Sequence, residues 1–292
     1  GICTFRLTAD YFYLGEGSML KIDTLERWIN DMAMLSRRDV FTVFTDMMQM
    51  SAIAMSNMLH LQMKADNPDY QFPAEVVERE ETYLATEKPY KEMGLNAKFG
   101  EFIGTLLLLM EQEPDDYLGS LFMRLQLSSS MRGQFFTPIG LSEMMAAITL
   151  GTTTGNDAFV SDIKTKLYNS NDYVTLYDPA VGAGSTLIGA IRNILRTEPK
   201  LMSNIVCVGA DVDIRCVHMA FTQLACIGVP AIISHQNTLS LETWSTWYTH
   251  QYFSHAIPMR KLIRENREKS VFGRRGTVST VRLAVHDYFK RS

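Results

Sequence analysis

An acidic, glycine-rich segment is the part of this sequence best suited to hold a ligand. Residues 178–187 read DPAVGAGSTL and follow an apolar run that predicts a strand. Gly182 and Gly184 lack a Cβ, so a ligand can approach the backbone closely there. The following residues predict a helix, whose first N–H groups and positive dipole end favour anions. A dinucleotide fingerprint would need a third glycine where Leu187 stands, so the segment is unlike that fingerprint.

Polar side chains also follow the next two predicted strands. Asp211 and Asp213 stand in the sequence GADVD, and a carboxylate at this point can accept hydrogen bonds from both hydroxyls of a ribose. We assign this role to Asp211, since Asp213 has a competing role as the cap of the next helix. Asn237 stands in QNTL after the third strand. Its amide oxygen could accept from an exocyclic amino group, or the segment could be an ordinary turn.

Alternating elements position these residues. Strands are predicted at 174–177, 204–209 and 231–234, and helices at 186–196 and 214–227. Strand and helix in turn indicate βαβ units and therefore an α/β fold with a parallel sheet. The residues before them predict helices, including one from Phe41 and others at 74–88, 98–112 and 117–127. Methionines are dense in the first of these, and we interpret them as core filler rather than as a promiscuous binding surface.

Three domains or segments are predicted from this organisation. They are an N-terminal helical domain at 1–128, a cofactor-binding domain at 129–258 and a basic C-terminal segment at 259–292. The whole chain of 292 residues has a net charge of −4, which is not typical of a nucleic-acid binder. The last segment, however, has ten Lys and Arg against three Asp and Glu. Such a segment can contact phosphates, or it can be a solvated or partner-bound tail.

Composition excludes several other classes. No apolar run approaches the roughly 20 residues that span a bilayer, so no membrane partner is predicted. None of the four cysteines forms a C-x-x-C pair or stands at zinc-ligand spacing, so no metal site is predicted. We interpret the cysteines as core residues, a pattern that suits a reducing cytoplasm.

Two blocks together carry a family resemblance. GQFFTP at residues 133–138, followed by the turn at 178–187, resembles the modification subunits of type I restriction systems and related adenine-specific N6 DNA methyltransferases. The resemblance implies a Rossmann-like methyltransferase fold with an N-terminal helical domain, S-adenosyl-L-methionine as cofactor, and DNA and restriction-modification subunits as partners. Homo-oligomers stay an open alternative.

The resemblance also implies a role for each residue that matches the family's motifs. Phe136, Thr137 and Pro138 would contact the methionine end of the cofactor. The turn would wrap the methionine and the ribose, and Asp211 would hold the ribose. Asn237 stands where the family usually has an aspartate against the adenine amino group. The residues of the turn that take part are Asp178, Ala180, Gly182 and Gly184.

The sequence departs from this family at the catalytic motif. The expected tetrapeptide is Asn or Asp, two prolines, and Phe or Tyr, whose parts grip the target amino group and stack on a flipped base. None of the nine prolines is adjacent to another, so no catalytic residue is assigned. The nearest fragment, at 67–70, is predicted to be a turn. The sheet could also be incomplete, because only one further strand is predicted, at 277–286.

Aromatic residues follow the third predicted strand instead. Those at 244, 247, 248 and 252 would share one helical face, which favours a packing or interface role over stacking on bases. Two functions are therefore carried forward. The first is an S-adenosylmethionine-binding protein of the DNA adenine-N6 methyltransferase type, with catalysis in doubt. The second is a non-catalytic methyltransferase mimic from a phage or mobile element, which contacts restriction-modification machinery.

Overall fold

The computed structural model describes residues 21–125, 173–197, 199–255 and 257, and its first part is helical. The five helices in this part are α1 (Ile22–Ser36), α2 (Val40–Asp66), α3 (Ala74–Glu92), α4 (Lys98–Gln112) and α5 (Tyr117–Arg124). The predicted helices are confirmed with small shifts at their ends. α3 runs past the predicted end through Pro89, and α5 ends three residues earlier than predicted, at Arg124. No helix in the described ranges is long and apolar enough to cross a membrane.

The second part alternates strands and helices, as predicted. Its elements are β1 (Val174–Asp178), α8 (Ser185–Thr197), the 3-10 helix η3 (Pro199–Asn204), β2 (Ile205–Asp211), α9 (Ile214–Ile227), β3 (Ala231–Asn237), β4 (Glu242–Tyr248) and α10 (His250–Ser254). The sheet has the strand order β1-β2-β3-β4. β1, β2 and β3 are parallel, while β4 is antiparallel to β3. This is the α/β class that the sequence predicts.

One prediction is wrong in this part. The aromatic residues after β3 do not share a helical face, because Trp244, Trp247 and Tyr248 lie on β4 and only Tyr252 lies on a helix. Pairing with β3 decides the outcome, since it gives every second residue of β4 a common face. Trp247 is buried against α9, where its ring meets Phe221, whereas Trp244 is 48% exposed. The packing role expected of these aromatics therefore holds for Trp247.

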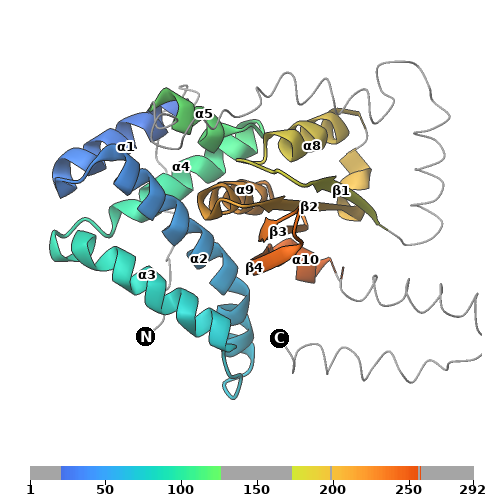
Figure 1. Cartoon of the computed structure of the whole chain (residues 1–292), viewed down its shortest axis with the longest axis horizontal. Helices are drawn as coiled ribbons and strands as arrows, with labels where there is room; N and C mark the ends of the chain where they lie inside the picture. Colours follow the sequence, from blue (N-terminus) through green and yellow to red (C-terminus); the bar gives the residue numbers. More distant parts are fainter. Residues whose placement is uncertain (1–20, 126–172, 198, 256, 258–292) are drawn as a thin grey trace, which may run out of the picture.

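Helix α9 is the element around which both parts pack. It is buried along most of its length, and α2, α4 and α5 all contact it (Figure 1). Its bounds match the prediction because both ends carry strong local signals. Asp213 caps the start, and Gly228 ends it with a positive φ of 79°. One continuous hydrophobic core joins the N-terminal helices, α8, α9 and the sheet.

Polar contacts reinforce this packing at two places. Arg79 on α3 donates a hydrogen bond to the Thr246 carbonyl at 2.8 Å, and its guanidinium lies 3.9 Å from the centre of the Trp247 ring. Arg192 on α8 forms ion pairs with Glu113 and Asp115, which both lie in the segment between α4 and α5. These ion pairs connect α8 to that segment. The N-terminal helices are thus attached at β4, one edge strand of the sheet, and at α8, which packs beside the other edge strand, β1.

The methionines of the N-terminal helices are mostly core residues, as interpreted. Met47, Met48 and Met50 are buried on α2, while Met58 is 49% exposed. The other face of the sheet carries a smaller cluster, in which Val206 packs against Tyr252 and residue 257. The boundary predicted near residue 129, the basic segment 259–292 and the strand predicted at 277–286 lie outside the described residues.

Candidate functional site

The glycine-rich turn connects β1 to α8 and takes a conformation that its glycines permit. Gly182 has a φ of 54° and Gly184 a φ of 99°, in the region that L-residues with a Cβ rarely adopt. The Gly184 amide closes the turn by donating to the Val181 carbonyl at 2.8 Å. Asp178 ends β1, and its carboxylate accepts from the Ala180 amide at 3.0 Å. Four predicted site residues therefore lie in one compact turn before the N-terminus of α8.

Asp211 is brought against this turn by the pairing of β1 with β2. One oxygen of its carboxylate accepts from the Gly182 amide at 3.0 Å, and the other accepts from the Asp213 amide at 2.9 Å. The turn is also hydrogen-bonded to β2 directly, since the Val181 amide donates to the Ala210 carbonyl at 2.9 Å. Burial raises the pKa of Asp211. Each carboxylate oxygen retains a second lone pair, so the group can still accept from a ligand hydroxyl.

A glycine on β2 makes room for the turn. A Cβ at Gly209 would lie 2.8 Å from the Val181 side chain, closer than real Cβ contacts allow. Gly184 is also close to another element, because a Cβ there would lie 3.4 Å from Ala220 on α9. The turn is thus packed between β2 and α9, which leaves its outer side for a ligand.

Asp213 takes the role that competed with ribose binding. It is the N-cap of α9 and accepts from the Arg215 amide at 2.9 Å, while its carboxylate is paired with the Arg215 guanidinium. Asn237 ends β3, and its amide oxygen accepts from the amides of Leu239 and Ser240 at 3.0 and 3.2 Å. This turn is the alternative that the sequence left open for Asn237. A contact between Asn237 and an adenine stays a prediction.

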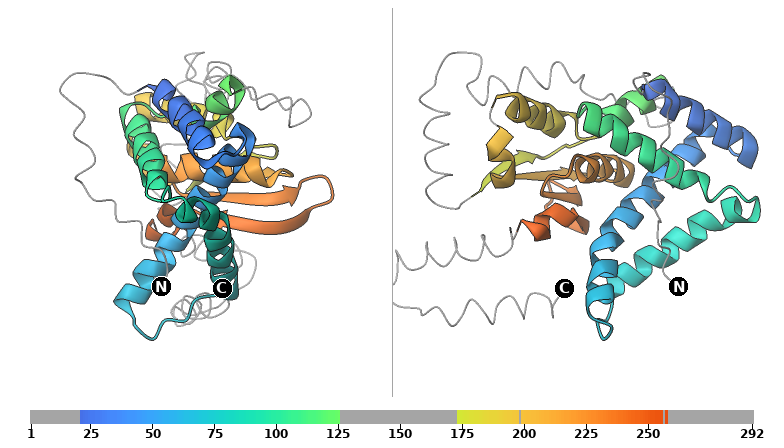
Figure 2. Two further views of the ribbon diagram at one scale, coloured as in Figure 1. Left: turned by 90° about the vertical axis from the view of Figure 1, so that its left-hand side faces the viewer. Right: turned by 180° about the vertical axis from the view of Figure 1, so that it is seen from behind.

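Exposed apolar side chains surround this edge of the sheet, which sequence reasoning missed. Val212 follows Asp211 directly and is 58% exposed, and Leu239 at the tip of the β3–β4 hairpin is 97% exposed. The hairpin extends away from the helices (Figure 2, left). His235 is the register partner of Asp211, lies 3.1 Å from the Val212 carbonyl and packs against the ring of Trp244. An aromatic or apolar ligand group at this edge would meet several such side chains.

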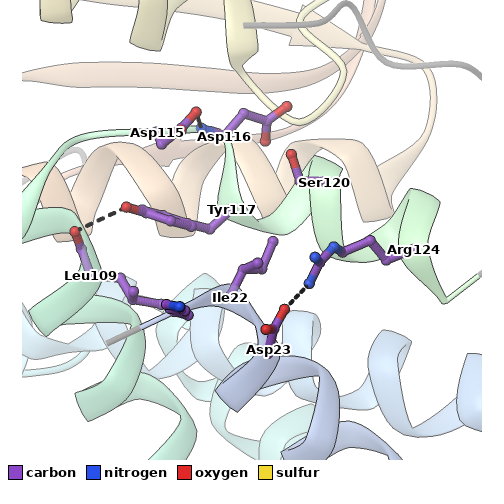
Figure 3. A pocket seen from close by; sticks show the side chains of 9 residues that line it. Ile22, Asp23, Leu109, Asp115, Asp116, Tyr117, Ser120 and Arg124 are labelled. Atoms are coloured by element: carbon purple, nitrogen blue, oxygen red, sulfur yellow. Dashed lines mark hydrogen bonds and ion pairs between the residues drawn. The ribbon is translucent and has the colours of Figure 1, made fainter. Parts of the chain in front are cut away.

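A cavity of about 430 Å³ lies elsewhere, among α1, α4 and α5. The Asp23–Arg124 ion pair stands on one side of it and Asp115 and Asp116 on the other (Figure 3). Tyr117 also lines it, with its hydroxyl donating to the Glu113 carbonyl at 2.9 Å. The cavity contains none of the predicted site residues. Phe136, Thr137 and Pro138, predicted for the methionine end of a cofactor, lie outside the described residues.

The fold and the turn define a class of protein, namely Rossmann-like α/β proteins with N-terminal helices and a mostly parallel sheet. Residues 117–258 match the family model described as N-6 DNA Methylase. Over these residues, slightly less than half of its length, the chain is similar to the N-6 DNA methylase family. The match includes the turn, Asp211 and Asn237.

Two solved structures resemble the chain at low sequence identity. One is a modification subunit of a putative type I restriction enzyme from Vibrio vulnificus YJ016, with 12% identity, 77% of this chain and 58% of that chain covered, and a TM-score of 0.43. The other is a type I restriction-modification system methyltransferase subunit from Streptococcus thermophilus, with 14% identity, 77% and 60% coverage, and a TM-score of 0.36. The chain thus spans about 58% of the first structure's length. No curated protein matches this chain.

Proposed function

We propose that this chain binds S-adenosyl-L-methionine at the turn between β1 and α8, as the cofactor-binding part of a DNA adenine-N6 methyltransferase. The observation that carries the proposal is the Asp211 carboxylate held 3.0 Å from the Gly182 amide. A ribose that lies over the turn can donate its hydroxyls to Asp211 while the turn's backbone approaches the rest of the molecule. The cytoplasm is the compartment that this function requires.

The residues of the turn fit the other parts of this cofactor. The methionine carboxylate is an anion, and the N-terminus of α8 is the positive end of that helix's dipole. The ammonium and sulfonium groups are cations, and Asp178 is the carboxylate at the end of β1. The exposed Val212 and Leu239 provide apolar surface for a purine ring. When bound, the cofactor would supply an activated methyl group, which an adenine amino group can accept.

Methyl transfer needs acceptors that grip the adenine amino group, and this chain has no pair of adjacent prolines to form the family's tetrapeptide. We therefore propose that a second polypeptide, such as a restriction-modification subunit, supplies the catalytic loop. The basic segment 259–292 is the part of the chain whose charge favours DNA. We also retain the proposed division into a helical domain at 1–128 and a cofactor-binding domain at 129–258.

The same absence favours a second candidate function, a non-catalytic methyltransferase mimic that acts through contacts with restriction-modification machinery. The exposed apolar side chains at Val212, Leu239 and Trp244 would then be part of a protein interface. The two functions differ in whether the cofactor binds.

Isothermal titration with S-adenosyl-L-methionine separates these candidates. The proposal predicts one binding site per chain, weakened by Asp178→Ala and unchanged by Asp31→Ala, which removes an exposed carboxylate from α1. Absence of binding to the wild-type chain would leave only the mimic. A tritiated-methyl assay on unmethylated DNA, with and without restriction-modification subunits, then tests catalysis. Transfer that needs the added subunit supports the division of labour, and transfer by the chain alone would contradict it.

A further inference from the structure

A buried glutamine on α9 connects the glycine-rich turn to the N-terminal helices. The Gln223 side chain is 0% exposed, and its Nε2 donates to the Ala183 carbonyl in the turn at 2.8 Å. The same nitrogen donates to the Asp116 carboxylate at 2.8 Å. The Gln223 side-chain oxygen accepts from the Leu118 amide of α5 at 3.0 Å. One side chain therefore joins three segments that are far apart in the sequence.

Asp116 holds the other end of this connection. It is the N-cap of α5, is only 4% exposed, and accepts from the Gly119 amide at 2.8 Å. A Cβ at Gly119 would collide with the Asp116 carboxylate, so the cap leaves this carboxylate no room to move toward α5. The Asp116 carboxylate is therefore fixed in its hydrogen bond with Gln223, and Gln223 in turn is fixed in its hydrogen bond with the Ala183 carbonyl of the turn.

Burying the polar Gln223 and Asp116 side chains costs more free energy than burying apolar ones. Their presence in the core therefore indicates that they fix one arrangement of the surrounding segments. A buried amide is tolerated only when its donors and acceptor are paired, and a fully paired network then fixes one arrangement. An apolar side chain at position 223 of α9 could fill the same space in the core, but it would leave the Ala183 carbonyl without this donor. Ala220, one turn earlier on α9, already contacts the turn at Gly184. The hydrogen bond from Gln223 thus fixes the orientation of the turn against α9, which the apolar contact of Ala220 alone would leave less defined.

We propose that Gln223, oriented by Asp116, is a positioning residue for the cofactor turn. By fixing the Ala183 peptide, it sets the orientation of the neighbouring Gly182 amide toward Asp211 and of the first amides of α8. The N-terminal helices then control cofactor affinity through α5, although none of the proposed cofactor-binding residues lies on them. This inference rests on the proposed function for its ligand but not for its geometry.

The first test replaces Gln223 by methionine, which has similar length and no hydrogen-bonding amide. The matched control is Thr222→Val on the same helix, because Thr222 is equally buried and its hydroxyl has no hydrogen-bond partner among the described residues. We expect Gln223→Met to weaken S-adenosyl-L-methionine binding about tenfold in calorimetry, since the buried hydrogen bond to the turn is lost together with those to Asp116 and Leu118. Thr222→Val should bind like the wild type. Equal affinity of both variants would overturn the proposal.

A second variant separates positioning from stability. In the Gln223→Glu/Asp116→Asn pair, the new amide at 116 can donate to the new carboxylate at 223, so α5 and α9 stay joined. The Ala183 carbonyl, however, still lacks a donor. We expect the double variant to regain most of the unfolding temperature lost in Gln223→Glu but not its cofactor affinity. Recovery of both together would show that Gln223 acts only through stability and would overturn the proposal.

Amide hydrogen exchange keeps this inference distinct from the proposed function. If the wild-type chain does not bind S-adenosyl-L-methionine, the proposed function fails, but the position of the turn can still be measured. We expect the Gly182 amide to exchange at least several-fold faster in Gln223→Met than in Thr222→Val. The same exchange rate in both variants would contradict a positioning role even with no ligand present.

Discussion

The backbone amide of Gly182 donates a hydrogen bond to the Asp211 carboxylate at 3.0 Å, although the two residues are 29 positions apart. The parallel pairing of β1 and β2 sets this relationship, because it aligns Asp178, the last residue of β1, with Gly209, two residues before the end of β2. The turn that follows β1 then meets the carboxylate that ends β2. A ligand held by the turn would therefore also contact Asp211.

Removal of the Asp211 carboxylate should weaken cofactor binding more than it weakens the fold. Asp211→Asn retains an oxygen for the Gly182 amide but loses the charge that favours ribose hydroxyls. Hydrogen bonds to charged groups contribute about 1.5–3 kcal/mol, so we expect about a tenfold to hundredfold loss of S-adenosyl-L-methionine affinity by calorimetry. The control is Asp213→Asn, which keeps an N-cap residue on α9. Similar losses in both variants would argue against a specific role for Asp211.

A methyl group at Gly209 should disturb the turn through Val181. Gly209→Ala places a Cβ 2.8 Å from the Val181 side chain, and overpacking of this kind costs about 1–3 kcal/mol. Urea unfolding should therefore give a lower free energy of unfolding for this variant. In a Val181→Ala background the closest contact, to a Val181 methyl group, is removed, while tight contacts to the Cβ of residue 181 at 3.0 Å and to Ile233 at 3.1 Å remain, so the same substitution should cost less. Equal costs in both backgrounds would mean that the strand and turn are not packed in this way.

Asp116 should make stability depend on pH in an unusual direction for an acid. Burial raises its pKa from 3.8 to about 6. Between these values the folded chain binds a proton that the unfolded chain has lost, so the free energy of unfolding falls as pH rises through this window. Each unit of pKa corresponds to about 1.4 kcal/mol. Above about pH 6 this contribution should no longer change.

Thermal unfolding of Asp116→Asn against the wild type measures this contribution. The asparagine keeps an acceptor for Gly119 and Gln223 but does not titrate. Relative to the wild type, it should therefore gain stability as the pH rises from about 4 to 6. Asp31→Asn, on an exposed part of α1, should not change relative to the wild type. A constant difference between Asp116→Asn and wild type over this range would show that Asp116 has an ordinary pKa.

Arg79 should stabilise the contact between α3 and β4. It donates to Thr246 and to the Ser56 hydroxyl, both at 2.8 Å, and covers the Trp247 ring. Arg79→Met removes these hydrogen bonds and the cation–π contact, so we expect a loss of about 2 kcal/mol in urea unfolding. Arg124→Met breaks only exposed ion pairs and should cost less than about 1 kcal/mol. The reverse order of these two costs would contradict the packing described for α3.

The sequence predicts the elements where local signals and tertiary packing agree. α9 is predicted to the residue because Asp213 and Gly228 mark its ends, and the turn is recognised because its glycines have few other uses. β2 and β3 extend beyond their predicted ends, to Asp211 and Asn237, because pairing between strands continues into polar residues. Such pairing is a tertiary effect that periodicity does not report.

The features that the sequence predicted wrongly or did not reveal have the same physical origin. The aromatic spacing after β3 fits a helix as well as a strand, and only the pairing of Ser234 with Thr246 and its neighbours selects the strand. Gln223 carries no local signal, and Asp116 carries only that of a helix cap, because an amide within a helix and an aspartate before one are both common. Their relationship depends on α5 meeting α9, which no sequence window contains.

A crystal structure of the chain grown with S-adenosyl-L-methionine would test the central claim most directly. The account predicts the nucleoside over the turn between β1 and α8, with both ribose hydroxyls within hydrogen-bonding distance of the Asp211 carboxylate. Crystals of the Asp211→Ala variant grown under the same conditions should lack the ligand. A turn without ligand at saturating cofactor, or cofactor bound instead in the cavity beside Asp23 and Arg124, would contradict it.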